Sequence, residues 1–408
     1  MGRFTNSVKE LGQHPGMSER QLQALINNYD LIDHIQHARR VIRIWEAARE
    51  LLDSAGIEVS GRLTLTQDNG QRTVEWRGIS HISKQFTVPT LLLDATLPPL
   101  PMLKLYHERA QIVADIKVAL PKSVHIRQLL GAPTSKRKLE CKRHLIEVRR
   151  HILARYLEFN RPRTLVMCQE KPEEWLKRRL PDDIAVEHYK NITGKDDYRD
   201  VRLMLLIGRT APGPATTETI AAALTGKCPV LATVNGNSFR WFDTVQRGIR
   251  LRDGSGIATR GDQHADPEAE AVRWQIHEAE LVQALGRGRG INRTAANPLD
   301  ADLLFDTALP VTVDEVLRWQ PPSLLIETAV EGVMLTSPCD LVKLWRKLWP
   351  NEKAAYRTVK AGVPKLPNFE RVEYQRAVPK MKQRVGYFDL ALIPDPRAWL
   401  EARLGPLM

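Results

Sequence analysis

Residues 201–207 read Val-Arg-Leu-Met-Leu-Leu-Ile, and residues 208–214 continue with Gly-Arg-Thr-Ala-Pro-Gly-Pro. An apolar run of this length, ended by glycine and proline, is typical of a strand buried on both faces of a parallel sheet. A similar run occupies 164–167, and a third strand is expected to begin at 184–186. Helices are expected between these runs. Strands that alternate with helices favour an α/β fold with a doubly wound parallel sheet.

The same alternation extends outward on both sides of this stretch. Further strands are expected at 88–93, 112–118, 124–129 and 303–305. A helix is expected from Ser135, or the lysines after it, to about residue 158. A second is expected over 172–180, and a third over 218–224 after a cap at Thr216 or Thr217. Further helices are expected over 266–285 and near 313–319 and 340–348. A stretch rich in Gly and Arg between 228 and 265 interrupts the pattern and is predicted to be an inserted hairpin.

The N-terminal part has a different pattern. Apolar residues recur at helical spacing from a cap at Ser18 to about residue 55, which predicts one long helix or a helix pair. Alternating residues on either side of Asp68-Asn69-Gly70 predict a hairpin. We therefore divide the chain into a helical segment (1–60), a segment with the 88–93 strand (61–120), the main α/β unit with its hairpin (121–305), and a small α+β accessory region (306–408).

Composition points to a globular protein with polyanionic partners. The 408 residues carry a formal net charge of +12, which favours contact with nucleic acid. Residues 136–163 hold ten Lys or Arg against three acids. This strip either neutralises backbone phosphates or forms a solvated helix face, and both interpretations fit the composition. No apolar run has the length of a membrane span, so a membrane is not expected as a partner.

The start of the chain and its cysteines predict a cytoplasmic location. Met1-Gly2-Arg3-Phe4 opens no apolar signal core. The four cysteines, Cys141, Cys168, Cys228 and Cys339, are scattered and have no zinc-ligand spacing. They are therefore expected to stay reduced, and no structural metal is expected.

The most distinctive short pattern lies at 280–293, Glu-Leu-Val-Gln-Ala-Leu-Gly-Arg-Gly-Arg-Gly-Ile-Asn-Arg. Here an apolar helix ends in arginines that are spaced by glycines. Arginine is always charged and presents a rigid fork of donors that fits phosphate oxygens. The pattern is therefore typical of a polyphosphate contact, and the alternative is a basic helix end on a solvated surface.

Three further loops are expected at the carboxyl ends of the strands, where open α/β sheets bind ligands. They are Cys168-Gln169-Glu170-Lys171, the stretch from His188 to Gly194, and the stretch 208–214. We expect the arginines at the end of helix 266–285 to lie at the same edge. Upstream, Leu93-Asp94-Ala95-Thr96 follows the 88–93 strand.

Taken in order, these stretches resemble a superfamily-2 helicase of the phage and plasmid primase–helicase type, over roughly residues 85–305. The Gln-x-x-Gly-Arg-x-Arg pattern resembles motif VI, 168–171 resembles motif IV, 208–214 stands in the place of motif V, and 94–96 resembles motif III. The resemblance implies that 121–305 is the second of two RecA-like lobes and that 61–120 is a remnant of the first. ATP and Mg²⁺ would be shared with the rest of the first lobe.

The resemblance also implies roles for individual residues. Catalytic arginine fingers would be Arg287 and Arg289, or Arg293 in place of the latter, and Gln283 would sense the nucleotide. The cofactor would further meet Gly286, Gly208 and Arg209. The nucleic acid, more readily DNA than RNA, would be held by Thr193, Gly194, Gln169, Lys171, Lys142, Arg143 and Arg149. Asp94 and Thr96 would couple hydrolysis to strand movement, and bases would stack on Trp241 and Phe242 unless these two belong to the core.

Two departures limit what the chain is expected to do alone. No Gly-x-x-x-x-Gly-Lys-Ser/Thr loop occurs, since Gly194-Lys195 precedes Asp196 and Gly226-Lys227 precedes Cys228. No Asp-Glu pair follows an apolar strand, because Asp314-Glu315 is expected to open the helix to Trp319. The chain is therefore expected to begin inside the first lobe, as a fragment or a split-gene product. It would then hydrolyse ATP only when completed by that lobe.

Two other classes of function stay open at this point. One is a nucleic-acid-binding or loading module that has no motor activity. The other is a two-lobed transferase that uses arginines to hold the diphosphate of a sugar nucleotide, which also requires acids near the Gly-Arg loop.

Overall fold

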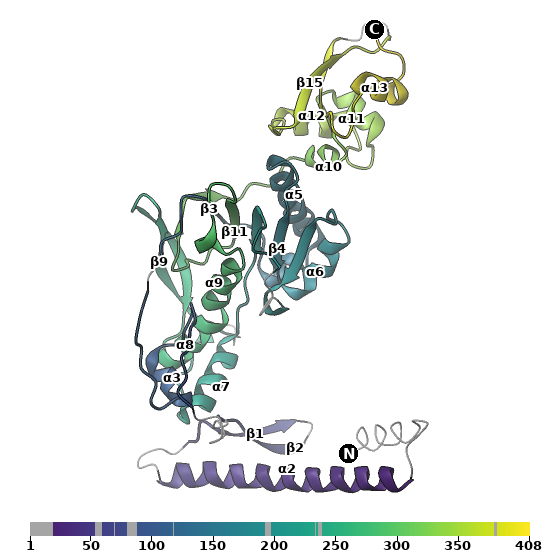
Figure 1. Ribbon diagram of the computed structural model, residues 1–408. Helices are drawn as coiled ribbons and strands as arrows, with labels where there is room; N and C mark the ends of the chain where they lie inside the picture. The colour runs from purple at the N-terminus through teal and green to yellow at the C-terminus, as the bar shows by residue number, and fades with distance from the viewer. Residues whose placement is uncertain are drawn as a thin grey trace.

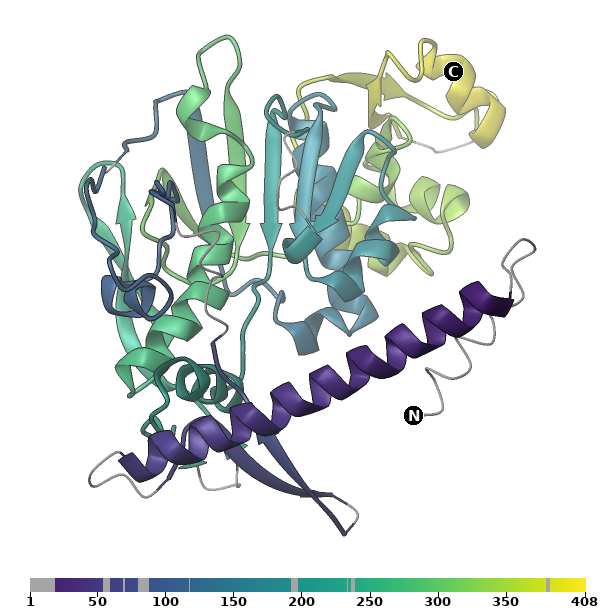
Figure 2. The same cartoon turned by 60° about the horizontal axis from the view of Figure 1, so that its bottom comes forward.

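A six-stranded parallel sheet forms the centre of the protein (Figures 1 and 2). The computed structural model describes residues 19–53, 59–68, 70–79, 88–116, 118–191, 197–232, 234–235, 239–378 and 382–408. The strands in sheet order are β13 (Glu315–Arg318), β3 (Val124–Leu130), β11 (Leu299–Leu304), β6 (Leu203–Ile207), β4 (Thr164–Cys168) and β5 (Ile184–His188). The predicted α/β class and parallel sheet are confirmed.

Side chains alternate between two apolar layers on the faces of the sheet. Val166 of β4 packs in the same cluster as helix α5 (Lys142–Glu158), whereas its neighbour Leu165 packs in the cluster of helix α9 (Glu278–Gly286). Strands that are apolar at every position fit this arrangement because both faces are covered. Each fully buried leucine adds roughly 1.5–3 kcal/mol of transfer free energy.

One charged cluster interrupts the α5 layer. Asp302 of β11 is wholly buried and accepts hydrogen bonds from Arg127 at 2.9 and 3.0 Å and from His151 Nε2 at 2.9 Å. Arg155 adds an ion pair at 3.0 Å. Burial disfavours the carboxylate, but these partners outweigh burial and lower the pKa of Asp302. The cluster ties α5 to the centre of the sheet.

Shorter helices connect the strands. They are α4 (Lys136–Leu139), α6 (Glu170–Lys177), η2 (Tyr189–Asn191), α7 (Pro214–Thr225), α8 (Pro267–Ile276) and η3 (Gly290–Asn292). Three predictions need correction here. The helix expected at 135–158 is divided into α4 and α5, the helix expected at 266–285 is divided at His277, and α7 begins at Pro214 with Gly213, rather than a threonine, as its N-cap. Pro214 starts α7 readily because a first-turn residue needs no intrahelical donor.

The predicted inserted hairpin is confirmed. Strands β9 (Asp243–Leu251) and β10 (Gly256–Gln263) pair antiparallel, and Gly254 has a φ of 90° in the turn between them. β12 (Thr312–Val313) extends this sheet beside β9, and β7 (Val234–Asn235) pairs with β8 (Phe239–Arg240). Ile249 of β9 is buried against the α9 layer, which fastens the hairpin to the main sheet.

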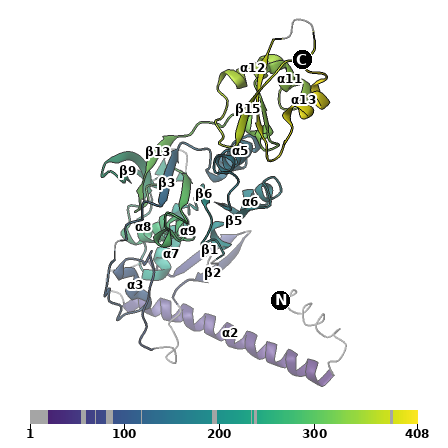
Figure 3. The ribbon, with the colours of Figure 1, turned by 45° about the horizontal axis from the view of Figure 1, so that its top comes forward.

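The N-terminal part lies at one end of the molecule and the C-terminal part at the other (Figures 1 and 3). Helix α2 (Glu19–Asp53) and the hairpin of β1 (Leu63–Asp68) and β2 (Gln71–Trp76) confirm the predicted long helix and hairpin. Helix α3 (Leu100–Tyr106) packs beside α7 and α8 through Met102. In the described ranges, no helix has the length and apolarity needed to cross a bilayer.

The C-terminal region is α+β, as predicted. Its antiparallel sheet has the order β14 (Val333–Leu335), β16 (Arg384–Asp389), β15 (Phe369–Tyr374), and its helices are α10 (Ile326–Ala329), α11 (Pro338–Leu344), α12 (Glu352–Lys360) and α13 (Pro396–Leu404). Its core is continuous with the α5 layer. The helix expected at 313–319 is wrong: β13 occupies 315–318 and extends the main sheet past the expected boundary at 305. The Asp314 carboxylate accepts from the Ile126 amide and from Arg252, which holds this segment against β3.

The expected buried strand at 88–93 is also wrong. This segment is extended but pairs with no strand, and Leu91 and Leu93 are 68% and 85% exposed. The strand expected at 112–118 is likewise absent from its described residues, and Val113 is 80% exposed. Apolar runs form strands only where partner strands lie beside them, and no described strand pairs with this segment. That 61–120 belongs to a first lobe stays a prediction.

Candidate functional site

Loops from four strands meet at the carboxyl edge of the sheet, which we define as the ends of β3, β6, β11 and β13. Gly208, directly after β6, has a φ of 72°, and a Cβ there would lie 2.4 Å from the Thr134 carbonyl oxygen. Glycine is therefore required for the close approach of two backbones. This packing accounts for Gly208, which the sequence assigned to cofactor binding.

Arg209 follows and lies at the centre of a polar network. Its Nη2 donates to Asp262 Oδ2 of β10 at 3.0 Å, and its Nη1 donates to Thr307 Oγ1 at 3.4 Å. Gln169, the predicted motif IV residue, donates from Nε2 to the Arg209 carbonyl oxygen at 2.7 Å. The structure thus brings two predicted site residues together. It also pairs Arg209 with an acid.

A buried histidine, His277, contacts this network through Thr307. Arg273 Nη1 contacts His277 Nδ1 at 3.2 Å, and His277 Nε2 contacts Thr307 Oγ1 at 3.1 Å. Burial, with Arg209 and Arg273 as neighbouring cations, lowers the pKa of His277 to about 2. The ring is therefore neutral at physiological pH, with Nδ1 accepting from Arg273 and Nε2–H donating to Thr307. Arg273 itself is buried between Glu270 and Glu278.

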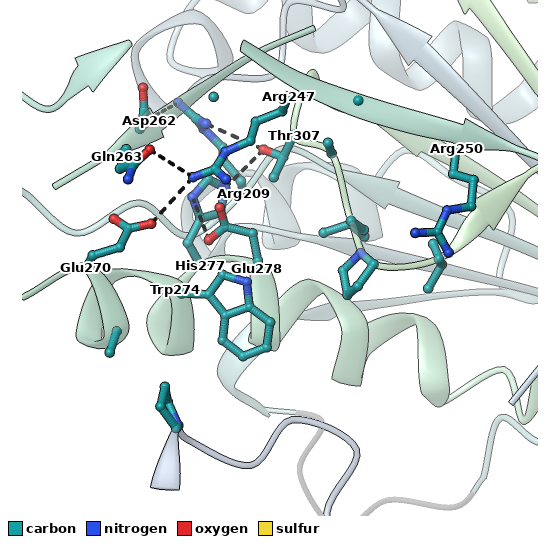
Figure 4. A pocket seen from close by; sticks show the side chains of 18 of the residues that line it. Arg209, Arg247, Arg250, Asp262, Gln263, Glu270, Trp274, His277, Glu278 and Thr307 are labelled. Carbon is teal, nitrogen blue, oxygen red and sulfur yellow. Dashed lines mark hydrogen bonds and ion pairs between the residues drawn. The ribbon is translucent and has the colours of Figure 1, made fainter. Parts of the chain in front are cut away.

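Two pockets adjoin Arg209. One, of about 570 Å³, is lined by Trp274, Arg247 and Arg250 among others (Figure 4). The other, of about 750 Å³, is lined by Lys138, Arg260 and Arg318 among others.

The sequence analysis selected none of these six residues for a site, although Lys138 lies within the basic strip 136–163. A signal for Arg318 existed. It follows Val316-Leu317, and reading those residues as a strand would have placed Arg318 at the carboxyl edge.

The basic strip divides into two parts with different surroundings. Lys142 is exposed, and Arg143 is exposed beside Glu147 at 3.0 Å. Arg149, predicted to hold nucleic acid, instead pairs with Glu327 at 2.7 Å and donates to the Arg179 carbonyl oxygen. Further along, the strip forms ion pairs in the same way through Arg150, Arg155, Arg161 and Arg163. These ion pairs join the second half of the strip to other parts of the fold, although the side chains of Arg163 and Asp200 are themselves 53% and 55% exposed.

The arginine motif lies at the opposite, amino edge of the sheet, so the expected position is wrong. A Cβ on Gly288 would lie 2.7 Å from Leu299, the first residue of β11, and one on Gly290 would lie 3.7 Å from Val124, the first residue of β3. The physical reason is that α9 runs antiparallel to the strands. Its first turn is near Thr210 and Thr307, and its last turn is near the strand beginnings, roughly 20 Å away.

The three arginines of the motif differ in their environments. Arg287, at the end of α9, is half-buried, and its Nε is buried with no hydrogen-bond partner within the described ranges. Arg289 is exposed and has a left-handed backbone with a φ of 50°.

Arg293 is 3% exposed and donates from Nε to the Gly288 carbonyl oxygen at 2.7 Å and from Nη1 to Asn297 Oδ1 at 3.0 Å. Of the two candidates for a second finger, only Arg289 faces solvent. Gly286, the other predicted site residue in this stretch, is exposed, and no atom would obstruct a Cβ there.

The predicted motif III and motif VI residues touch. Gln283 Nε2 donates to Thr96 Oγ1 at 2.6 Å, and Gln275 Nε2 donates to the Thr96 carbonyl oxygen at 2.9 Å. Thr96 donates from its hydroxyl to Asp94 Oδ1 at 2.9 Å, and its amide donates to the same oxygen at 2.7 Å. Thr96 is buried in this contact. The structure therefore joins three residues that the sequence analysis selected separately.

The remaining predicted residues are distributed over the surface. Thr193 and Gly194 lie outside the described residues. Lys171 is exposed and pairs with Glu140 at 2.8 Å. Phe242 is buried against His264, which supports its core role, whereas Trp241 is 51% exposed. All four cysteines are free thiols.

Comparisons with known proteins give no further assignment. No protein-family model, no curated protein and no solved structure matches this chain significantly. The functional argument therefore depends on the geometry above.

Proposed function

We propose that this chain acts as the second RecA-like lobe of an ATP-dependent nucleic-acid translocase of the superfamily-2 helicase type. A first lobe would supply the phosphate-binding loop and the Mg²⁺ ligands. The observation that carries the proposal is the Gln283–Thr96–Asp94 contact. Two stretches that resemble helicase motifs VI and III were identified independently, 187 positions apart, and form one hydrogen-bonded unit.

The positive charge of the arginines beside this unit would suit a polyphosphate. Arg287 stands four positions after Gln283 and so on the same side of α9. Its side chain is half-buried, and its Nε is buried without a hydrogen-bond partner in the part of the chain that the structure describes. Gln283, Arg287 and Arg289 would then face a nucleotide at the amino edge, and not at the carboxyl edge where the sequence analysis expected the arginines to lie. A bound ATP would supply a transferable phosphoryl group, and guanidinium groups stabilise the charge that develops in such transfers.

Exposed apolar side chains support a position for the proposed first lobe. Leu91, Leu93 and Val113 are all more than two-thirds exposed, and large exposed apolar side chains would suit a surface that a partner covers. Thr96 holds the first of these segments against α9. A partner covering this surface would therefore also face Arg287 and Arg289. In this proposal the nucleotide lies on the first-lobe side, and the nucleic acid lies at the carboxyl edge.

The test begins with the DNA upstream of the Met1 codon. The proposal predicts a reading frame there that encodes Gly-x-x-x-x-Gly-Lys-Ser/Thr. Co-expression of that frame with this chain should give ATP hydrolysis stimulated by single-stranded DNA, while either part alone should hydrolyse ATP no faster than a blank. Turnover by this chain alone would contradict the proposal.

A second candidate is a nucleic-acid-binding or loading module without motor activity. It is favoured by the sequence itself, which contains no phosphate-binding loop, together with Lys138, Arg260 and Arg318 at the carboxyl edge, which form no ion pair with a described residue. If the upstream frame is missing, or if it binds this chain but stimulates no hydrolysis, this candidate replaces the first. No observation favours the transferase, because Asp262, Glu270 and Glu278 beside Arg209 are engaged by arginines.

A further inference from the structure

The carboxyl edge carries several exposed cations. Lys138 of α4, Arg260 of β10 and Arg318 of β13 are exposed and line the larger pocket, and none forms an ion pair with a described residue. The two acids in the same lining are already engaged. Asp262 pairs with Arg209, and Asp306 accepts from the Gly131 amide at 2.6 Å. The pocket therefore has an excess of positive charge and suits phosphate groups.

The smaller pocket adds a stacking surface. Trp274 projects from α8 toward the hollow that Arg247 and Arg250 of β9 border (Figure 4). The indole has no aromatic or cation–π partner in the described part of the chain. Arg250 is exposed without an ion pair there, and Arg247 lies 3.8 Å from Glu270. An open tryptophan face beside two arginines is the arrangement that binds an unstacked base together with its phosphates.

The two pockets are adjacent, and we call them together the groove. Arg209, Gly261 and Asp262 belong to the lining of both, so the Arg209–Asp262 pair stands between them. The hairpin strands β9 and β10 border the groove along its length. Arg273 and His277 are buried next to the Arg209–Asp262 pair and hold it in place through Thr307.

We propose that this groove is the path of a single nucleic-acid strand. Phosphates lie against Lys138, Arg260 and Arg318, and one base stacks on Trp274, with Arg247 and Arg250 at the following phosphates. The inference rests on the proposed function and specifies its strand-binding residues. A duplex keeps both faces of its bases stacked, so Trp274 selects single strands.

The test measures binding of fluorescein-labelled oligo(dT) to the full chain by anisotropy over a range of KCl concentrations. The double variant Arg260→Gln/Arg318→Gln should reduce the slope of log K against log [KCl] by about 1.4, since each phosphate contact on a single strand contributes about 0.7. The matched control is Arg346→Gln/Lys347→Gln, two exposed cations of the C-terminal region, which should leave the slope unchanged.

Stacking is tested separately. Trp274→Ala should weaken binding about 5- to 150-fold at fixed salt without changing the slope, corresponding to about 1–3 kcal/mol per stacked base. Trp274→Phe should restore most of the affinity. Trp45→Ala, which removes a tryptophan that is 71% exposed on α2, should have no effect. Circular dichroism checks that every variant keeps the wild-type fold.

Each outcome decides a specific point. If wild type binds oligo(dT) but groove and control variants behave alike, the groove assignment is overturned while the proposed function stands. If wild type fails to bind oligo(dT) at 50 mM KCl, the proposed function itself fails. If free dTMP competes as well as oligo(dT) per nucleotide, the groove is a mononucleotide site and the strand path is wrong.

Discussion

Gln283 donates a hydrogen bond from Nε2 to Oγ1 of Thr96 at 2.6 Å, across 187 positions of sequence. The Thr96 hydroxyl accepts this hydrogen bond and donates to Asp94 Oδ1 at 2.9 Å, so the 94–96 turn is linked to α9 through Gln283. Arg287 stands one turn beyond Gln283. A ligand that shifts Arg287 would therefore reach Thr96 through one turn of α9 and the Gln283 side chain.

The Gln283–Thr96 bond should be measurable as a coupling free energy. Gln283→Ala and Thr96→Val each remove one partner, and a double-mutant cycle in urea unfolding should return about 0.5–1.5 kcal/mol. Gln275→Ala combined with Thr96→Val is the matched control, because Gln275 bonds the Thr96 carbonyl oxygen, which valine retains. Equal coupling in both cycles would show that the hydroxyl contact has no specific role.

The arginines of the motif should divide into one structural residue and two functional ones. Arg293→Ala should lower the unfolding free energy by about 1–3 kcal/mol, because it leaves the Gly288 carbonyl oxygen and Asn297 without their donor. In the two-lobe assembly, Arg287→Ala should abolish ATP hydrolysis and leave DNA binding intact. Chemical denaturation and a coupled ATPase assay separate the two effects. Persistent hydrolysis in Arg287→Ala would refute its assignment as a finger.

Asp302 should be essential for stability. Asp302→Asn leaves Arg127, His151 and Arg155 around a neutral group, and loss of one member of a buried ion cluster costs about 3–5 kcal/mol. Asp182→Asn, at an exposed carboxylate, is the control and should change little.

The pH dependence of stability should report on Asp302 as well. The folded pKa of Asp302 lies below its ordinary value of 3.8, so its contribution is complete above that pH and is lost as the pH falls further. Urea unfolding at pH 5 and pH 3 should show a smaller loss for Asp302→Asn than for wild type. An identical loss would show that the cluster is not the acid-sensitive element.

His277 should make the free energy of unfolding depend on pH over a second, less acidic range. Its folded pKa of about 2 lies below the ordinary 6.5, so folding excludes a proton that the unfolded chain binds. Its contribution is complete above pH 6.5 and falls between pH 6.5 and about 2, which amounts to roughly 2 kcal/mol between pH 7.5 and pH 5. His277→Gln should show a flatter profile over that range. A profile parallel to wild type would contradict the neutral, buried imidazole.

Apolar runs determined the sheet because they act locally. Strands β4 and β6 are apolar at nearly every position, and such runs can only be satisfied by cover on both faces. The same reasoning failed at 88–93, where an equally apolar run pairs with none of the strands that the structure describes. It failed again at 315–318, where two apolar residues among charges pair with β3 and form an edge strand.

The candidate site required the tertiary structure to a greater degree. Gln283 and Thr96 were each selected from a short pattern, but nothing in either pattern states that they touch. The direction of α9 decided that Arg287 lies at the amino edge, away from Arg209. Trp274, Arg260 and Arg318 come from three elements with no shared spacing, so no sequence pattern connects them.

The sequence by itself determined the α/β class, the hairpin and the excess of positive charge, because burial of apolar runs and turn chemistry depend on neighbours along the chain. Only the tertiary structure decided which cations remain unpaired. Arg149 and Arg318 are both arginines in basic or apolar surroundings, yet one meets Glu327 and the other faces an open groove. Ion pairing depends on what the fold places within about 4 Å, and that distance is not a property of the sequence.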